Sequence, residues 1–312
     1  MKIVLGTMTF SDQVDQSTAC SMLDMFRATQ HHEVDTAYVY NKGETEKLLG
    51  LLNKNGVLHD TALAGKANPA VGGGLTAQSV TMQLTESLAR LKQDAFDLFY
   101  LHMPDLKTPI SRTLACIDEH YRQGKFKRFG LSNYAAWQVA EIVELCNQND
   151  WVQPTVYQGM YNALTRDVER ELLPCLANYN ISFYVYNPLA GGMLTGKHTS
   201  VDASPQRGRF ASFDSYQDRY WKPDMFNMVS SFAKACEAND IVPANAALRW
   251  LIHHSDITNN ADHAIILGAS STEHLKQNLA AFEQGPLPDA VLQALDDGWQ
   301  QVRPVCIKYF RP

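Results

Sequence analysis

Residues 96–131 have the sequence FDLFYLHMPDLKTPISRTLACIDEHYRQGKFKRFGL. Two short apolar runs, 96–101 and 126–131, flank an amphipathic run, 111–123, which Gly124 ends. A short apolar segment, a helical segment and a second short apolar segment predict a βαβ unit, whose parallel strands are covered on both faces. This stretch therefore predicts an α/β fold with a parallel sheet.

The same alternation continues in both directions along the chain. Eight candidate strands are short and mostly apolar: residues 3–5, 33–35, 62–65, 96–101, 126–131, 155–158, 182–186 and 264–267. Candidate helices follow them at residues 16–29, 45–52, 77–91, 111–123, 135–147, 167–178, 244–253 and 272–281. Thr76 is the expected N-cap of the third helix, and Pro243 is expected to open the seventh. Eight such units predict a (β/α)8 TIM barrel.

Two segments exceed a bare eight-unit repeat. Residues 191 to about 239 combine a loop rich in Gly and Ser with an extra helix from about Asp224. The chain after Pro286 offers a helix over about 288–302 and a C-terminal tail. Because a typical barrel of this type has roughly 250 residues, the 312 residues of this chain leave room for both additions. We therefore expect a single domain over residues 1–312.

Composition excludes several classes of protein. The 27 Lys and Arg against 33 Asp and Glu give a net charge of −6, and the scattered basic residues offer no stripe for a phosphate backbone, so we expect no nucleic-acid partner. No apolar run is long enough for a membrane span or a signal peptide, which predicts no membrane association. The six cysteines lie far apart without a CxxC pair, which favours reduced thiols in the cytoplasm and no metal site.

Polar residues end or follow most of the predicted strands, where the active sites of such barrels form. They are Asp35 and Tyr40, Lys66, His102, Ser132 and Asn133, Gln158, and Tyr186 and Asn187. Each alone has an ordinary alternative, such as a turn cap or a satisfied core histidine. Because barrel closure brings all strand ends onto one rim, we expect a carboxylate, a phenol, an ammonium and an imidazole to converge there and move a proton to or from a substrate oxygen.

The chemistry of this set can be stated from the side chains themselves. A tyrosine has an unperturbed pKa of about 10, and a nearby ammonium lowers it by favouring the phenolate. We expect Lys66 to supply that charge to Tyr40 and Asp35 to be its counter-ion. Neutral His102 is expected to donate a hydrogen bond to a carbonyl.

Several motifs, taken in order, resemble the aldo-keto reductase superfamily: DTAYVY at 35–40 with Gly43 and Glu46, Lys66, YLH at 100–102, GLSNY at 130–134, YQ at 157–158 and YNPL at 186–189. Residues 158–162, 189–197, 219–222 and 309–311 are similar to its aflatoxin aldehyde reductase and succinic semialdehyde reductase branch. The resemblance implies NADPH-dependent reduction of aldehydes or ketones to alcohols. It makes Tyr40 the general acid, Lys66 and Asp35 its tuning pair, and His102 the group that orients the carbonyl.

No GxGxxG follows the first strand, which disfavours a Rossmann site. The resemblance implies instead that NADPH lies across the barrel mouth. The nicotinamide ring would stack on Tyr186, and its carboxamide would form hydrogen bonds with Ser132, Asn133 and Gln158. The cofactor would also contact Asp35. The pyrophosphate loop would consist of Asn187, Pro188, Leu189, Ala190, Gly191, Gly192, Leu194 and Gly196. The adenosine end would lie at Arg209, Gly268, Ser270, Ser271, His274, Gln277 and Asn278.

Gly268 and His274 stand where many members of the superfamily have Lys and Arg, so the 2′-phosphate would depend on Ser270, Ser271, the helix N-terminus and Arg209. The substrate pocket implied by the resemblance consists of Met8, Phe10, Tyr40, His102, Tyr216, Arg219, Trp221 and Arg311. Two arginines suit an aldehyde that carries a distant carboxylate; a surface salt bridge for Arg219 and a frayed tail for Arg311 are the alternatives.

The resembling branch contains homodimers, so a homodimer is possible here. Two other functions remain open. The first alternative is a nicotinamide-binding regulatory subunit, because the potassium-channel β subunits resemble this barrel and much of its rim. The second is a phosphate-binding barrel isomerase, which would not depend on nicotinamide.

Overall fold

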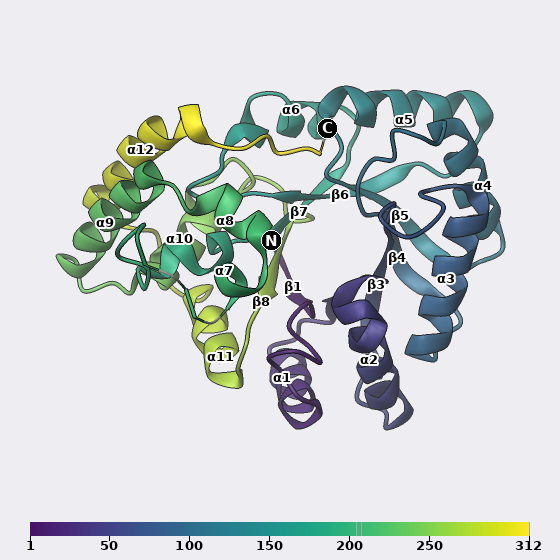
Figure 1. Ribbon diagram of the computed structural model, residues 1–312, viewed down its shortest axis with the longest axis horizontal. Helices are drawn as coiled ribbons and strands as arrows, with labels where there is room; N and C mark the ends of the chain where they lie inside the picture. Colours follow the sequence, from purple (N-terminus) through teal and green to yellow (C-terminus); the bar gives the residue numbers. More distant parts are fainter. Residues whose placement is uncertain (204, 207, 312) are drawn as a thin grey trace.

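The computed structural model describes residues 1–203, 205–206 and 208–311. Within them, eight parallel strands close into a barrel in which neighbours in sequence pair and β8 returns to β1 (Figure 1). The strands are β1 (Lys2–Gly6), β2 (Glu33–Asp35), β3 (Ala62–Ala67), β4 (Phe96–Leu101), β5 (Phe126–Ser132), β6 (Pro154–Met160), β7 (Ser182–Tyr186) and β8 (Ala264–Gly268). The predicted TIM barrel is therefore confirmed.

Helices follow the strands around the barrel: α1 (Gln16–Ala28), α2 (Glu44–Lys54), α3 (Ala77–Leu91), α4 (Ile110–Arg122), α5 (Ala136–Asn149), α6 (Leu172–Asn178), α10 (Pro243–His253) and α11 (Thr272–Ala281). Short 3-10 turns are η1 (Tyr40–Gly43), η2 (Asp167–Glu169), η3 (Ala190–Thr195) and η4 (Arg303–Val305). Thr76 caps α3 by accepting from the Ser79 amide, and Pro243 opens α10, as predicted.

Two layers of apolar side chains hold the barrel together. The larger packs the helices against the outer faces of the strands. The smaller fills the barrel interior with Val4, Ala64, Leu98, Tyr100, Val156, Tyr184, Ala264 and Ile266. The two layers arise because successive strand residues point to opposite faces, as Ile3 and Val4 do. The filled interior leaves the strand ends as the place for a site.

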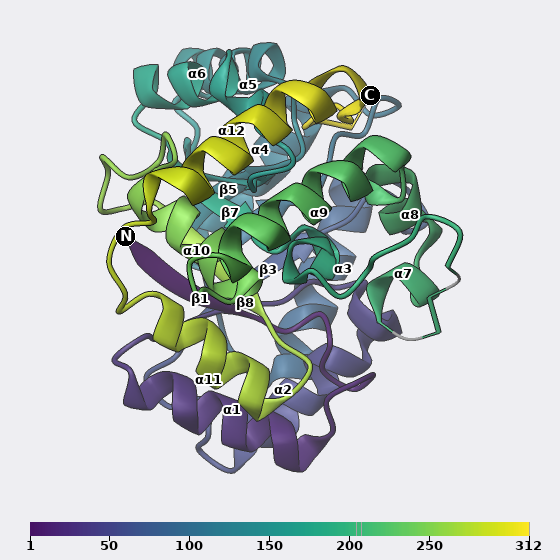
Figure 2. The same cartoon turned by 90° about the vertical axis from the view of Figure 1, so that its left-hand side faces the viewer.

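Between β7 and α10 the chain forms α7 (Arg209–Ser212), α8 (Asp214–Tyr220) and α9 (Pro223–Glu237), and it ends with α12 (Asp289–Val302) and the tail. The predicted additions are confirmed for α9 and α12, whereas α7 and α8 form within the segment that the sequence predicts as a loop. Figures 1 and 2 show α9 and α12 side by side along one flank of the barrel. Arg166 ties α12 to the barrel, because its Nη1 donates to Asp296 Oδ1 at 2.7 Å and its guanidinium lies 4.4 Å from the ring centroid of Trp250.

The structure corrects three predicted boundaries. Lys66 lies inside β3, and Gln158 lies two residues before the end of β6, so both strands run further than their apolar runs. The helix predicted over 167–178 is interrupted: η2 ends at Glu169 and α6 begins at Leu172. Glu171 between them accepts a hydrogen bond from the Tyr309 hydroxyl at 2.5 Å, a tertiary contact that local periodicity does not encode.

Among the residues that the structure describes, no helix combines the length and apolar character that crossing a bilayer requires.

Candidate active site

Lys66 is the centre of the polar cluster at the carboxyl ends of the strands. Its Nζ lies 2.5 Å from Asp35 Oδ1, 2.6 Å from the carbonyl oxygen of Thr36 and 3.4 Å from the Tyr40 hydroxyl. The lysine side chain is fully buried. The ammonium thus donates to a carboxylate from β2, a main-chain carbonyl and the phenol that begins η1. The structure brings together three of the four groups that the sequence predicts to converge: the carboxylate, the phenol and the ammonium.

A turn after β2 positions the phenol. Asn41 and Lys42 adopt positive φ angles of 46° and 57°, which turn the chain sharply just after Tyr40. The Asn41 side-chain amide donates to the carbonyl oxygen of Phe10 at 2.6 Å, and Phe10 is itself fully buried. Asparagine is one of the few residues that tolerate this conformation. The turn is therefore anchored to the loop after β1.

His102 lies beside Tyr40 and immediately after β4. The two ring centroids are 6.1 Å apart with an interplanar angle of 80°. The backbone of His102 is fixed on both sides, because its N–H donates to the Ala67 carbonyl oxygen at 2.8 Å and its own carbonyl accepts from Asn133 Nδ2 at 2.9 Å. The imidazole therefore faces the phenol from a rigid part of the rim.

Burial determines the protonation states of these groups. Burial first, with repulsion from Lys66 and Arg311, lowers the pKa of His102 to about 3, so its imidazole is neutral near pH 7. Burial also lowers the pKa of Lys66, and Asp35 opposes that shift. Burial and the Asp35 charge raise the pKa of Tyr40 well above its ordinary value.

This last direction corrects the expectation that Lys66 lowers the pKa of Tyr40. The main physical reason is burial, which disfavours the charged phenolate, and the nearby Asp35 carboxylate adds to it. Lys66 is itself paired with that carboxylate. Tyr40 is therefore a protonated phenol near neutral pH. A proton donor rather than a phenolate faces the barrel mouth.

Four further predicted residues lie at the same rim in two sets: Gln158 beside Asp35, and Ser132, Asn133 and Tyr186 beside His102. Gln158 Nε2 donates to Asp35 Oδ2 at 2.8 Å. Asn133 Nδ2 donates to Ser132 Oγ at 2.9 Å, and Asn133 Oδ1 accepts from the Tyr186 hydroxyl at 2.7 Å. Ser132, Asn133 and Gln158 are buried, whereas Tyr186 is partly exposed. Amide groups and an aromatic face thus adjoin the proton-donating pair.

The loop after β7 is built for close approach to its backbone. Asn187, Ala190, Gly191, Gly192 and Gly196 all have positive φ. A Cβ on Gly191 would lie 2.6 Å from the Tyr216 ring, so only glycine fits there. Asn187 Nδ2 is buried without a hydrogen-bond partner among the described residues, and so is a donor in need of an acceptor.

The three remaining residues of the predicted pyrophosphate loop differ in burial. The Leu194 side chain is fully buried in the hydrophobic core, so only its backbone can serve a ligand. Pro188 is buried as well, while Leu189 is partly exposed.

The predicted adenosine end lies at the N-terminus of α11. Ser271 caps the helix by accepting from the His274 amide, and Ser270 Oγ lies 3.1 Å from His274 Nδ1. Gln277 is exposed and bonded to Glu273, whereas Asn278 is buried, so these two lie on different sides of the helix.

Arg209 reaches this corner from the insertion. Its Nη2 would lie 3.3 Å from a Cβ on Gly268, and its Nη1 donates to the Tyr216 hydroxyl at 3.1 Å. Its Nη1 also lies 2.9 Å from Met8 Sδ. The guanidinium therefore stands directly over the strand end where the sequence lacks a basic side chain.

The predicted substrate residues divide into two groups. Tyr216 is buried, with the guanidinium carbons of Arg209 and Arg219 5.4 and 5.2 Å from its ring centroid. Arg219 is 8% exposed and has no acidic partner among the described residues. Arg311 is exposed, but its backbone N–H donates to the Asn133 carbonyl oxygen at 2.9 Å, which brings the tail to the rim.

Trp221 forms the second group, because residues of the insertion hold it. Its indole N–H donates to the Val201 carbonyl oxygen at 2.8 Å, and its ring centroid lies 5.0 Å from that of Phe210 and 4.9 Å from that of Phe226. These contacts make Trp221 part of the packing of the insertion.

Sequence reasoning missed Asn68, which contacts His102 directly. Asn68 Nδ2 lies 3.1 Å from His102 Nδ1. Asn68 follows Lys66 by two residues at the same strand end, and this position is the feature of the sequence that indicates a place at the rim.

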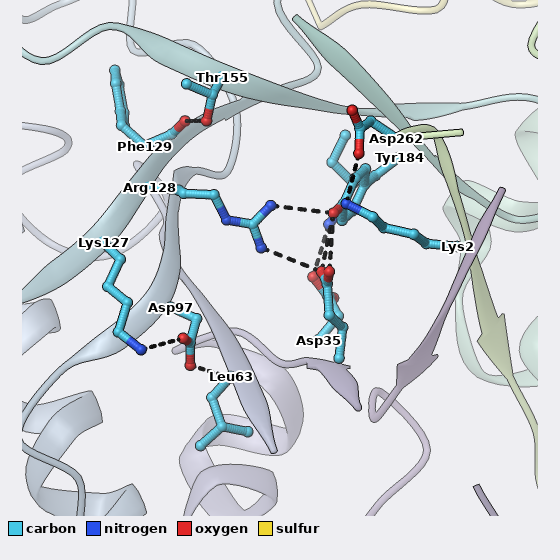
Figure 3. A network of polar contacts seen from close by, with 12 residues as sticks. Lys2, Asp35, Leu63, Asp97, Lys127, Arg128, Phe129, Thr155, Tyr184 and Asp262 are labelled. Carbon is cyan, nitrogen blue, oxygen red and sulfur yellow. Dashed lines mark hydrogen bonds and ion pairs between the residues drawn. The ribbon is translucent and has the colours of Figure 1, made fainter. Parts of the chain in front are cut away.

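Several charged side chains pair with one another at the amino ends of the strands. Figure 3 shows Arg128 directed toward Tyr184, Lys127 toward Asp97, and Lys2 toward Asp262. Arg128 also pairs with Glu33 at 3.4 Å. These pairs lie at the amino ends of the strands, whereas the predicted site residues gather at the carboxyl ends.

Comparisons with known proteins show the family of this chain. The model of the aldo/keto reductase family matches residues 2–300. The chain is 45% identical to aflatoxin B1 aldehyde reductase member 2 of Mus musculus, with 99% of this chain and 87% of that protein covered. It is 44% identical to aldo-keto reductase family 7 member A3 of Homo sapiens, with 99% and 96% covered. The human aflatoxin B1 aldehyde reductase member 4 is also 44% identical, with 98% and 96% covered. The chain belongs to the aldo/keto reductase family of oxidoreductases.

Proposed function

We propose that this protein reduces aldehydes to alcohols with NADPH, and that residues 1–312 act as one domain. One observation carries the proposal: the Lys66 ammonium contacts both Asp35 and the Tyr40 hydroxyl, beside the neutral imidazole of His102. A protonated phenol next to a buried ammonium can give its proton to a carbonyl oxygen, because the ammonium stabilises the phenolate that is left.

Each polar side chain has one task in this mechanism. His102 donates a hydrogen bond to the carbonyl oxygen and orients it toward Tyr40. Tyr40 transfers its proton to that oxygen, and Lys66 then donates to the phenolate oxygen. Asp35 keeps the buried lysine protonated by pairing with it. NADPH, when bound, supplies the hydride that forms the new C–H bond.

The residues at the barrel mouth fit a nicotinamide cofactor. The amide and hydroxyl groups of Ser132, Asn133 and Gln158 suit a carboxamide, and the partly exposed ring of Tyr186 suits a nicotinamide face. Asn187 Nδ2, which has no hydrogen-bond partner among the described residues, and the positive-φ glycines suit a pyrophosphate, which accepts hydrogen bonds from side chain and backbone.

A preference for NADPH over NADH is supported by the corner that Arg209 forms with α11. A guanidinium over Gly268 and a helix N-terminus capped by Ser271 both favour a phosphate group. The cation that Gly268 and His274 do not supply is thus available from the insertion.

The substrate class is supported by the arginines at the rim. Arg219 is a buried guanidinium without a carboxylate partner in the described part of the chain, and buried charges are normally paired. An aldehyde with a carboxylate at its far end would supply the missing partner to Arg219 and Arg311.

Initial rates of NADPH oxidation test this function. We expect steady turnover with 4-nitrobenzaldehyde and with a carboxylated aliphatic aldehyde, and lower turnover with NADH. Tight cofactor binding with negligible turnover would instead favour a regulatory subunit.

Substitution of Arg311 tests the substrate class. We expect Arg311→Ala to raise the KM for the carboxylated aldehyde by about tenfold or more, the size of a lost charge-assisted hydrogen bond, with little change for 4-nitrobenzaldehyde. Lys308→Ala removes an exposed cation from the same tail and is the matched control. Equal KM increases for both aldehydes in Arg311→Ala would contradict the assignment.

A further inference from the structure

The Asn68 side chain contacts the imidazole of His102 at its Nδ1 atom. Its Nδ2 lies 3.1 Å from His102 Nδ1. An amide nitrogen can only donate a hydrogen bond, so His102 Nδ1 must accept and cannot carry a proton. In a neutral imidazole the single proton then sits on Nε2.

The amide orientation follows from a second contact. Asn68 Oδ1 accepts from the backbone N–H of Ala70 at 2.8 Å. A backbone N–H can only donate, so the amide oxygen must face Ala70 and the NH2 group must face His102. If the amide were flipped, its NH2 group would face the backbone N–H of Ala70, and two donors repel. The hydrogen-bond network therefore fixes which nitrogen of the imidazole is the acceptor.

Gln83 holds Asn68 itself in place. Gln83 Oε1 accepts from the Asn68 backbone N–H at 2.8 Å, and Gln83 Nε2 donates to the Asn68 carbonyl oxygen at 3.1 Å and to Ser79 Oγ at 3.1 Å. Gln83 is fully buried on the inner face of α3, and Asn68 is 4% exposed. A buried clamp of this kind keeps the donor aimed at the ring.

We infer that Asn68 is a positioning residue that locks His102 in the Nε2–H tautomer, so that the ring presents a hydrogen-bond donor to the carbonyl oxygen. The catalytic part of this inference rests on the proposed function, whereas the tautomer is a property of the protein alone. A ring with its proton on Nδ1 would present a lone pair to the carbonyl oxygen, and two acceptors repel. The low pKa of His102 agrees with the inference, because a neutral ring has to choose one nitrogen.

Two variants separate this role from a purely structural one. Asn68→Asp keeps the oxygen that accepts from Ala70 but replaces the donor to His102 by an acceptor, which favours a proton on Nδ1. Asn68→Ala removes both contacts. If Asn68 only supports the turn, Asn68→Asp is the milder change. If it sets the tautomer, Asn68→Asp is the more damaging one, with a fall in kcat of about tenfold to a hundredfold, the range found when a partner that orients a histidine is removed.

The decisive measurement is the 15N spectrum of histidine-labelled full-length protein, with the His102 signals assigned by His102→Gln. We expect wild type to show a protonated Nε2 and an unprotonated Nδ1, and Asn68→Asp to show the reverse or an imidazolium. Asn53→Asp, which alters an amide that donates to the Leu91 and Lys92 carbonyl oxygens, is the control for added charge. A protonated Nδ1 in wild type, or an unchanged tautomer in Asn68→Asp, would overturn the inference. Absence of turnover in wild type with an Nε2–H ring would refute the proposed function alone.

Discussion

At the scale of single residues, the Lys66 contacts define what each neighbour can do. Lys66 Nζ lies 2.5 Å from Asp35 Oδ1 and 3.4 Å from the Tyr40 hydroxyl, so the ammonium pairs more closely with the carboxylate than with the phenol. In the proposed mechanism, the phenol keeps its proton until a substrate oxygen takes it, and the ammonium then donates a hydrogen bond to the phenolate.

Tyr40→Phe tests the proton donor. We expect kcat to fall by about 10²- to 10⁴-fold, the usual contribution of a general acid, while NADPH affinity measured by protein fluorescence changes little. Tyr38→Phe is the matched control, because this tyrosine donates to Glu86 at 2.7 Å and lies outside the cluster. Comparable turnover in Tyr40→Phe and wild type would remove Tyr40 from the mechanism.

His102 predicts a pH dependence of stability. Its pKa is about 3 in the folded protein and about 6.5 in the unfolded chain, so below pH 6.5 the unfolded state binds a proton that the folded state excludes. The contribution is fully present above pH 6.5 and is lost as the pH falls toward 3. The slope is at most about 1.4 kcal/mol per pH unit, and less to the extent that the ring is solvated at the rim.

Urea unfolding of His102→Gln and wild type between pH 4 and pH 8 checks this expectation. The free-energy difference between the two proteins should shift in favour of the variant as the pH falls. His59→Gln, at an exposed position, is the control. A difference that stays constant over the whole range would show that His102 is not held neutral by the fold.

At the scale of elements, one buried arginine links α12 to the barrel. Arg166 donates to Asp296 on α12, to the Leu295 carbonyl oxygen at 3.0 Å and to the Ala163 carbonyl oxygen at 3.3 Å, and it stacks on Trp250. We expect Arg166→Ala to lower the free energy of unfolding by about 3 kcal/mol, because it leaves buried acceptors unpaired.

The same variant should loosen α12 before the barrel unfolds. Limited proteolysis is expected to cut near residues 286–302 sooner than in wild type, with urea midpoints giving the global change. Arg303→Ala, an exposed arginine after α12, is the control. Equal protease resistance in Arg166→Ala and wild type would mean that apolar packing alone holds α12.

At the scale of the whole molecule, Arg209 joins the insertion to the β8 end of the barrel. A ligand bound at 100 times its Kd stabilises a protein by about 2.7 kcal/mol, so we expect NADPH to raise the Tm by several degrees. Arg209→Ala should reduce the rise with NADPH and leave the rise with NADH nearly unchanged. Lys197→Ala, also in the insertion, is the control. A barrel isomerase would show no shift with either nucleotide.

Much of this protein follows from its amino-acid order alone. Short apolar runs alternating with amphipathic ones predict eight strands and their helices, because periodicity and burial are local properties of the chain. The residues after those runs, such as Asp35 and His102, mark the rim for the same reason. The single-domain organisation, the homodimer and the cytoplasmic location stay predictions.

The tertiary structure decides what depends on residues far apart in sequence. Closure of the barrel brings Lys66 to Asp35 and buries Tyr40 beside that carboxylate, and burial first, then the Asp35 charge, raises the pKa of Tyr40 instead of lowering it. It also sets the contact between Asn68 and His102, and packing places Trp221 within the insertion. Desolvation and hydrogen-bond direction arise only once the chain has folded around these groups, so no local pattern in the sequence encodes them.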